Sequence, residues 1–208
     1  MSYFPADKYD DAGAYAQAYF SRLSSVASTL DFGALSAAGQ LLGERARKGA
    51  TIYSCGNGGS AAIANHLVCD CLKGVRANTD LKPRVQSLST NIELITAIVN
   101  DIGVEEVFEY QLSSLGLAGD VLIAISSSGT SPNVVRVIKT AKVMGLATIA
   151  MTGFTGGPSA KLADISLHVS AKNYGLIEDT HQSMMHILAQ FMRQSQLTSP
   201  ELLGSLKF

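Results

Sequence analysis

Short apolar runs alternate with longer amphipathic stretches along most of this chain. Most of the runs have the length and the Ile, Val, Ala and Leu content of strands, and glycine or polar residues bound them. They predict strands at residues 51–54, 85–88, 121–125, 147–151 and 165–169. Because every residue of the third run is apolar, that run is typical of a strand that is covered on both faces.

Apolar residues at helical spacing fill much of the chain before and between these runs. They predict helices at residues 11–29, 32–48, 61–72, 92–99, 105–115, 132–144 and 174–196. Strands and helices that alternate in this way form βαβ units. The sequence therefore predicts an α/β fold with a mostly parallel sheet and helices on both faces. The first two helices precede the first strand, and a partner subunit offers a surface on which they can pack.

Length and charge favour one domain with a small-molecule ligand. The 208 residues suffice for one α/β domain, which buries roughly 70% of its unfolded surface. The expected parts are N-terminal helices for oligomerisation (1–48), the ligand-binding domain (49–196) and a C-terminal tail (197–208). A net charge of −1 argues against nucleic acid and anionic membranes as partners, so small metabolites are the more natural ligands.

Cysteine usage and hydropathy predict a cytoplasmic protein. The chain has an odd number of cysteines and no basic, apolar N-terminal signal, so we expect reduced thiols. No apolar run approaches the roughly 18 residues that a membrane-spanning helix needs.

A glycine-rich turn lies between the first predicted strand and its helix. Residues 55–60 read Cys-Gly-Asn-Gly-Gly-Ser. Glycine lets the backbone approach a ligand closely, and the free N–H groups at a helix start attract an anion. A dinucleotide fingerprint would need an acidic residue after the second strand, where residues 89–91 are Ser-Thr-Asn. The turn is therefore either an anion cradle or a purely structural tight turn.

A second polar loop follows the third predicted strand. Residues 126–131 read Ser-Ser-Ser-Gly-Thr-Ser, and Pro132 suits the first position of the next helix. Ser131 is placed to cap that helix, but capping does not explain the other hydroxyl residues. Hydroxyls beside free N–H groups favour phosphate binding. Because both loops follow strands of a parallel sheet, we expect them at the same edge of the sheet.

Two of the predicted helices carry histidine and carboxylate residues at helical spacing. His66 and Asp70 are four residues apart and share a face. On the last helix, Glu178, Gln182 and His186 step four residues at a time and form one stripe. Each pair alone can be a helix-stabilising contact. Two His/carboxylate pairs together can supply the nitrogen and oxygen ligands of a metal site.

These motifs together resemble the sugar isomerase (SIS) domain family. The matching stretches are Cys-Gly-Asn-Gly-Gly-Ser-Ala-Ala at 55–62, Asn-Asp at 100–101, Gly-Asp-Val-Leu-Ile-Ala-Ile-Ser-Ser-Ser-Gly-Thr-Ser at 119–131 and the histidine-bearing last helix. The resemblance covers roughly residues 10–196. Within the family, the chain is similar to the sedoheptulose-7-phosphate isomerases, also called phosphoheptose isomerases. The resemblance implies a three-layer α/β/α domain and a homotetramer with sites between subunits.

The resemblance also implies roles for single residues. Positions that bind the phosphorylated sugar in those isomerases are matched by Asn57, Gly58, Gly59, Ser60, Asp101, Ser126, Ser127, Ser128 and Ser131. The positions that hold a zinc ion are matched by His66, Asp70, Glu178 and His186. A carboxylate at the position of Asp70 and the histidine at the position of His186 then act as base and acid.

This chain departs from the resembling pattern at four positions. Asp70 replaces a glutamate, and Glu178 replaces a glutamine. Gly74 stands where an arginine is expected, with Lys73 beside it, and Gly175 stands where an aspartate is expected.

The reaction that the resemblance implies is aldose–ketose isomerisation of a phosphorylated sugar through an enediolate. If Asp70 and His186 stay bound to the metal throughout, a neighbour such as His181 must share the proton transfer. His181 and Gln182 are also candidates for outer positions around the metal. Some SIS-domain proteins instead bind the replication initiator DnaA or sense phosphosugars. The two His/carboxylate pairs favour the enzyme over such an adaptor.

Overall fold

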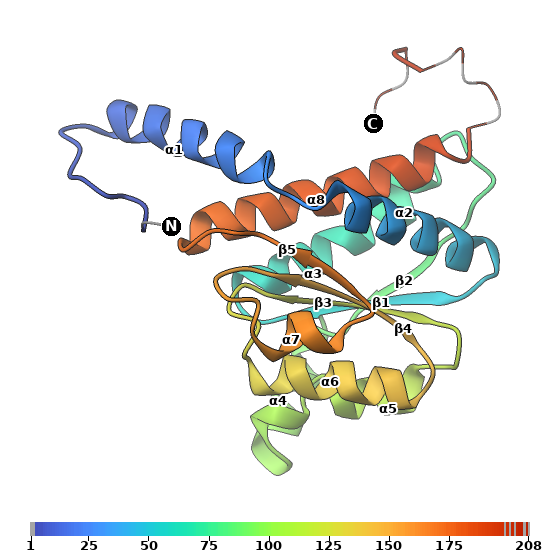
Figure 1. The fold of residues 1–208 in the computed structure, drawn as a ribbon. Helices are drawn as coiled ribbons and strands as arrows, with labels where there is room; N and C mark the ends of the chain where they lie inside the picture. Colours follow the sequence, from blue (N-terminus) through green and yellow to red (C-terminus); the bar gives the residue numbers. More distant parts are fainter. Residues whose placement is uncertain (1–2, 198, 200, 202, 206, 208) are drawn as a thin grey trace.

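Five parallel strands form a sheet in the order β2-β1-β3-β4-β5 (Figure 1). The computed structural model describes residues 3–197, 199, 201, 203–205 and 207, so the other positions of the expected tail lie outside the described residues. The strands are β1 (Thr51–Gly56), β2 (Arg84–Ser87), β3 (Val121–Ser126), β4 (Ala147–Thr152) and β5 (Ile165–His168). Each matches a predicted strand, and the parallel α/β sheet is confirmed.

The α-helices follow the predicted pattern with one addition. They are α1 (Ala12–Ala27), α2 (Phe32–Arg47), α3 (Gly59–Cys69), α4 (Ile92–Asp101), α5 (Glu109–Leu115), α6 (Pro132–Val143), α7 (Gly157–Leu162) and α8 (Tyr174–Gln194). Helix α7 was not predicted, because six residues are too few to show helical periodicity. The helix expected at 61–72 continues as a π-helix, η1 (Asp70–Val75), and a 3₁₀ turn, η2 (Val104–Glu106), precedes α5.

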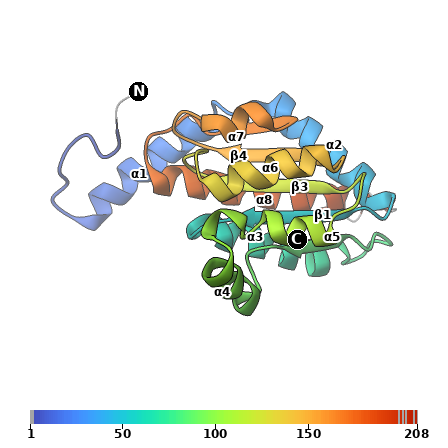
Figure 2. The same cartoon turned by 90° about the horizontal axis from the view of Figure 1, so that it is seen from below.

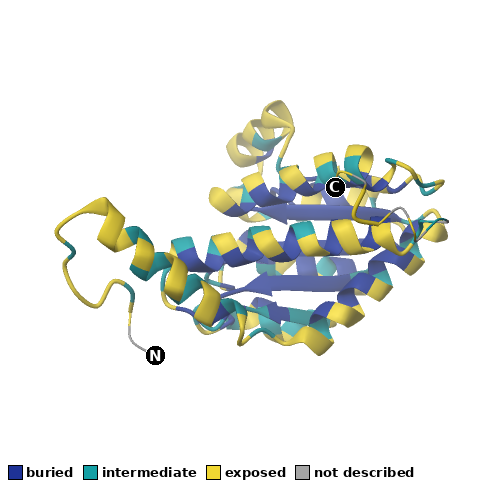
Figure 3. Cartoon of the chain, turned by 90° about the horizontal axis from the view of Figure 1, so that it is seen from above, coloured by how far each residue is buried: buried dark blue, intermediate teal, exposed yellow. Residues whose placement is uncertain are grey.

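The sheet is buried between two layers of helices, as Figure 3 shows by the dark strands. Successive residues of a strand point to opposite faces. Ile123 and Ile125 of β3 pack with residues of α2, α3 and α8. Leu122 and Ala124 pack with residues of α4, α5 and α6 on the other face. The expected three-layer α/β/α arrangement is confirmed.

Strand β1 lies at the point where the strand order changes direction. The chain passes from β1 to β2 on one side, and β3 then adds to the other side of β1. Between β1 and β3, the loops at the carboxyl ends therefore diverge and leave room for a ligand. The glycine loop follows β1 and the serine loop follows β3, so the two loops lie at the same edge, as predicted.

Helices α1 and α4 extend beyond the three layers (Figures 1 and 2). Helix α1 packs on α8, where the Tyr19 hydroxyl donates a hydrogen bond of 2.6 Å to Asp179. Both projecting regions carry exposed apolar side chains, namely Tyr15, Phe20, Ile92 and Val99. Among the described residues, every helix is too short or too polar to cross a bilayer.

Candidate active site

A cavity of about 160 Å³ lies at the carboxyl edge of β1 and β3. We call it the hydroxyl pocket, and its lining residues are Asn57, Ser60, Ile125, Ser126, Ser127, Ser128, Ser131, Tyr174 and Glu178. All the serines that the sequence predicted for sugar-phosphate binding are among them. The structure therefore brings the glycine loop and the serine loop together around one space.

The glycine loop turns sharply into α3. Gly58 has a φ of +53°, which an L-residue adopts only with strain, and it precedes the first residue of the helix. Gly58 has no side chain to cap α3, and the N–H groups of Ser60 and Ala61 donate to the carbonyl oxygens of Asn57 and Gly58. Among the described residues, the N–H of Gly59 has no such partner and is the first-turn donor left for a ligand. The positive end of the α3 dipole thus faces the hydroxyl pocket.

Hydrogen bonds within the serine loop hold it in place: the Ser126 and Ser128 hydroxyls accept from the N–H groups of Gly129 and Thr130. Ser131 is the N-cap residue of α6, but its side chain makes no capping bond, contrary to prediction. Its hydroxyl instead lies 3.4 Å from that of Ser126. The Ser127 hydroxyl is buried without a partner among the described residues. A buried hydroxyl without a partner is costly, and an anion in the pocket would satisfy it.

A pair of asparagines ties the two loops together. The Asn57 amide donates to the side-chain oxygen of Asn133, and the Asn133 amide donates back, both at 2.9 Å. Asn133 is buried and also accepts a bond from the N–H of Val134. Sequence reasoning missed Asn133, because its partner is 76 residues away and no local pattern reports that contact.

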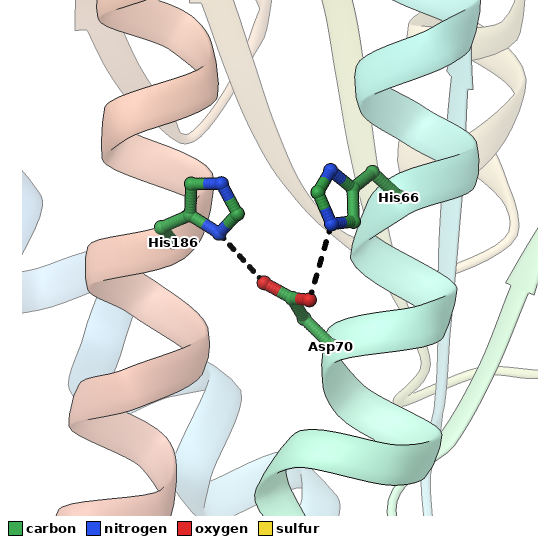
Figure 4. A group of neighbouring side chains, drawn as sticks. All are labelled: His66, Asp70 and His186. Atoms are coloured by element: carbon green, nitrogen blue, oxygen red, sulfur yellow. Dashed lines mark hydrogen bonds and ion pairs between the residues drawn. The ribbon is translucent and has the colours of Figure 1, made fainter. Parts of the chain in front are cut away.

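Four side chains form a closed ring between α3, η1 and α8, which we call the histidine ring. Asp70 lies between the two histidines (Figure 4), with His66 Nε2 at 3.3 Å and His186 Nδ1 at 2.7 Å from its oxygens. Gln182 Nε2 closes the ring at 3.0 Å from His66 Nδ1 and 2.9 Å from His186 Nε2. The amide can donate to both rings, and both rings can then donate to the carboxylate, so all four imidazole nitrogens and both carboxylate oxygens are matched.

The histidine ring has the composition of a metal site. His66, Asp70 and His186 each offer a ligand atom, and these atoms lie within 4.8 Å of one another. Two imidazoles and a carboxylate are the nitrogen and oxygen donors that borderline metals such as zinc accept. These three residues thus lie close together, as predicted, although His186 is 116 residues from Asp70 in the chain.

The structure does not bring Glu178 into the histidine ring. Its side chain leaves α8 one turn before Gln182 and turns into the hydroxyl pocket instead. There its carboxylate lies against Gly59, the first residue of α3: a side-chain carbon added at Gly59 would lie 2.9 Å from the Glu178 carboxyl carbon. The stripe that the sequence predicted on α8 is real, but its middle member, Gln182, completes the ring.

The hydroxyl pocket has a carboxylate at one end, where Glu178 lies beside α3, and hydroxyl groups at the other end, in the serine loop. Two like charges 4 Å apart repel each other by about 4 kcal/mol at an effective dielectric constant of 20. A bound phosphate would therefore avoid the Glu178 carboxylate at α3 and prefer the serine loop and the start of α6. The described residues that line the pocket include no Lys or Arg, so hydroxyl and N–H groups must bind such an anion.

The remaining histidines of the chain lie outside the histidine ring. His181 is fully buried, its Nε2 lies 3.1 Å from the Thr152 carbonyl oxygen, and burial lowers its pKa to about 4. His168 lies 3.1 Å from the Thr152 hydroxyl, and burial lowers its pKa too. Both are neutral structural histidines near the end of β4, as the sequence predicted for His168.

Asp101 and the two unexpected glycines lie outside the hydroxyl pocket. Asp101 is exposed on α4 and accepts a bond of 2.6 Å from Asn100. Gly74 faces open space beside a second cavity of about 250 Å³ that Asp70 and His186 also line. A side-chain carbon at Gly175 would lie 2.9 Å from the Tyr19 hydroxyl, so an aspartate there would collide with α1.

The strand order and the pocket at its switch point define a doubly wound α/β protein with a cavity between two strand-end loops. Residues 14–153 match the family model described as the SIS domain. The chain therefore belongs to the SIS domain family, as the loop motifs predicted.

Several similar proteins share the name phosphoheptose isomerase. The chain is 42% identical over 143 residues to a phosphoheptose isomerase of Nitratidesulfovibrio vulgaris, which covers 69% of this chain and 68% of the relative. It is 36% identical over 167 residues to a phosphoheptose isomerase of Coxiella burnetii, covering 79% and 83%. The solved phosphoheptose isomerase GmhA of Neisseria gonorrhoeae superimposes with a TM-score of 0.80 at 30% identity, covering 88% of this chain and 98% of that one. The predicted similarity to phosphoheptose isomerases is confirmed.

Proposed function

We propose that this protein is a phosphosugar isomerase that interconverts sedoheptulose 7-phosphate and D-glycero-D-manno-heptose 7-phosphate, or a closely related ketose–aldose pair. The relatives named phosphoheptose isomerase support the reaction class. The observation that carries the proposal is the histidine ring beside the hydroxyl pocket, since α8 contributes side chains to both. A non-catalytic adaptor would have no use for the ring.

The hydroxyl pocket binds the phosphate end of the sugar in this proposal. Ser126, Ser127, Ser128 and Ser131 surround the phosphate at the start of α6. The free Ser127 hydroxyl supports this placement, because the phosphate would supply its missing acceptor. Asn57, Ser60 and the N–H groups of Gly58 and Gly59 face the sugar from the other loop.

The histidine ring holds a divalent metal ion, which we propose is zinc. His66, Asp70 and His186 supply the ligand atoms, and Gln182 lies where it can bind the ion or orient the two histidines. A zinc ion there would stabilise the negative charge that develops on the oxygens of an enediolate. Proton transfer by Asp70 and His186, as the family resemblance implies, requires each to be free of the ion at that step.

The working enzyme is a homotetramer in this proposal, with the N-terminal helices (1–48) in the contacts. Exposed apolar side chains on α1, α2 and α8 support it, namely Phe20, Phe32, Ile187 and Phe191. Asp101 lies outside the hydroxyl pocket of its own chain and projects on α4, so it would reach the sugar in a neighbouring subunit's site. Closed symmetric assemblies are the usual outcome for such surfaces.

The test is metal analysis followed by a proton NMR assay with sedoheptulose 7-phosphate and a panel of shorter ketose phosphates. We expect about one zinc ion per subunit and conversion of the heptose phosphate that stops on chelation and returns with added zinc. Failure of the zinc-loaded protein to convert any member of the panel would overturn the proposed function.

A further inference from the structure

Tyr174 is an aromatic side chain in the wall of the hydroxyl pocket. It is the first residue of α8, and it lines the pocket together with the serines. It is nevertheless 59% exposed, so much of its side chain is not covered by protein. A large, open aromatic ring in the wall of a polar cavity offers apolar surface that a ligand can cover.

A second aromatic ring supports Tyr174 at the serine-loop end of the pocket. The ring centroids of Tyr174 and Phe154 are 4.8 Å apart, and the rings meet edge to face at 64°, which is a favourable geometry for an aromatic pair. Phe154 lies in the loop after β4, and in this loop the N–H of Gly153 donates to the carbonyl oxygen of Ser127 at 2.8 Å. The pair of rings and the serine loop are therefore parts of one connected unit.

The backbone of Phe154 is held in a conformation that is rare for a residue with a side chain. Its φ is +46°, in the left-handed region that favours glycine. Such a conformation persists where the surroundings fix it, and it occurs often beside functional sites. Here the N–H of Phe154 donates to the carbonyl oxygen of Ala171 at 3.2 Å, which ties the loop to the segment that leads into α8.

The backbone at the start of α8 is also fixed. The side chain of Asn173 accepts a hydrogen bond from the N–H of Leu176 at 3.0 Å and thereby caps the helix. Its amide donates to the carbonyl oxygen of Phe4 at 2.9 Å, so the N-terminal segment holds the helix start as well. Because both the backbone and the ring of Tyr174 are held, little conformational freedom is lost when a ligand covers the ring.

We propose that Tyr174 is a substrate-binding residue whose ring packs on the carbon chain next to the phosphate group of the sugar. This inference rests on the proposed function, in which the serine loop binds the phosphate. The C–H groups of a sugar chain offer apolar surface to the ring, and inorganic phosphate has no such groups. Tyr174 therefore makes the pocket selective for phosphate esters of polyhydroxy carbon chains over inorganic phosphate.

The hydroxyl of Tyr174 is the alternative contact, because it could donate to the phosphate itself. We find no hydrogen bond of this hydroxyl to another described residue. The pocket already has the hydroxyls of five serines as donors to an anion, whereas Ile125 is its single aliphatic lining residue among those described. The ring thus supplies the apolar surface that the pocket otherwise lacks.

The test measures binding of two probes, inorganic phosphate and glycerol 3-phosphate, to the zinc-loaded full-length protein by titration calorimetry. Glycerol 3-phosphate is an ester of a polyhydroxy chain without a carbonyl, so it can bind but cannot be isomerised. The variants are Tyr174→Ala, Tyr174→Phe and the control Tyr110→Ala, whose tyrosine is exposed on α5 outside the pocket. Melting curves, light scattering, and KM and kcat for sedoheptulose 7-phosphate are measured for each.

We expect Tyr174→Ala to weaken binding of glycerol 3-phosphate about tenfold, because covering roughly 60 Å² of apolar ring surface suffices for a change of that size. Binding of inorganic phosphate should change less than about twofold. KM for the heptose phosphate should rise while kcat stays the same, as for a contact that is equal in the ground state and the transition state. Tyr174→Phe keeps the ring and should bind both probes as the unmodified protein does, and so should Tyr110→Ala.

Several results would overturn the assignment of Tyr174. Unmodified protein that binds glycerol 3-phosphate no more tightly than inorganic phosphate shows no such selectivity, and neither does a Tyr174→Ala protein that binds the ester normally. Equal weakening of both probes, or weaker phosphate binding by Tyr174→Phe, would assign the hydroxyl to the phosphate. Dissociation of the assembly in Tyr174→Ala would make the ring a subunit contact.

Failure of the proposed function can be told apart from failure of this assignment. If the unmodified protein turns over no sugar phosphate, the isomerase proposal fails. The calorimetric comparison of the two probes does not depend on turnover, so it still decides whether the Tyr174 ring binds the carbon chain of a phosphate ester.

Discussion

The hydroxyl pocket is built from two short loops at strand ends, whereas the histidine ring is built from side chains on separate helices. Backbone bonds hold the serine loop: the N–H of Gly129 donates to Ser126, that of Gly153 to Ser127, and that of Ser159 to Gly129. The ring has no such backbone support. It is held by the packing of α3 and η1 on α8 and by its own hydrogen bonds.

Because of this difference, the two regions are expected to contribute unequally to the stability of the fold. The side chains of His66, Asp70 and His186 are 46%, 24% and 37% exposed, so solvent screens their interactions. Ion pairs of that kind contribute about 0–1 kcal/mol to folding. The serine loop is continuous with the buried β3 strand, and its distortion would disturb the sheet. The ring should therefore tolerate substitution without unfolding, while changes in the pocket must be confined to hydroxyl groups.

The largest expected effect comes from removing a member of the histidine ring. His186→Ala should abolish both bound metal and turnover, because it deletes one of the nitrogen ligands. The fold should persist, since the apolar residues of α8 still pack. Metal analysis, the NMR assay and a melting curve measure the three quantities.

Gln190→Ala is the matched control, because Gln190 is exposed on α8 one turn beyond His186. It should keep metal and turnover. A His186→Ala protein that retained a full complement of metal would show that the ring is not the metal site. The histidine ring and the hydroxyl pocket could then no longer be assigned to metal and phosphate, respectively.

The second expected effect concerns the hydroxyl pocket alone. Ser127→Ala removes a buried hydroxyl that has no partner among the described residues, so stability should change little. A hydrogen bond to a charged acceptor contributes about 1.5–3 kcal/mol, so inhibition by inorganic phosphate should weaken by about 10–100-fold. Metal content should not change.

The control for this prediction is Ser113→Ala on α5, whose hydroxyl donates to the Tyr110 carbonyl oxygen and faces solvent. It should leave phosphate inhibition as it is. Equal inhibition of Ser127→Ala and the unmodified protein would move the phosphate away from the serine loop.

The two regions also differ in how far the sequence predicts them. The loops at 55–60 and 126–131 are local features, and the apolar runs before them predict the strands that bring them together. Helical spacing likewise predicts that Glu178, Gln182 and His186 share one stripe. Spacing alone does not say which of them faces α3, because that depends on how α8 is rotated in the packed structure. Gln182 therefore took the place that the family pattern gave to Glu178.

Other differences from the sequence-based expectations have local physical causes. The π-helix η1 adds a wider turn after α3, and π-turns have no distinct hydrophobic period. Ser131 was expected to cap α6 with its side chain, but the N–H of Val134, which such a cap would bind, donates to the side chain of Asn133 instead. The Ser131 hydroxyl lies 3.4 Å from that of Ser126 and lines the pocket.

The smallest expected effect concerns the pair of amide hydrogen bonds between Asn57 and Asn133, which connects the glycine loop to the start of α6. Asn133→Ala removes both amide bonds to Asn57 but leaves every predicted phosphate donor in place. Net hydrogen bonds contribute about 1 kcal/mol each, so phosphate inhibition should weaken by roughly fivefold through the lost alignment of the loops. Asn65→Ala is the control, because Asn65 accepts a bond from Ser87 on the far side of α3 and should lower stability without changing phosphate inhibition. If Asn133→Ala leaves phosphate inhibition unchanged, the serine loop alone determines the affinity. The glycine loop would then serve the sugar end, where Glu178 lies.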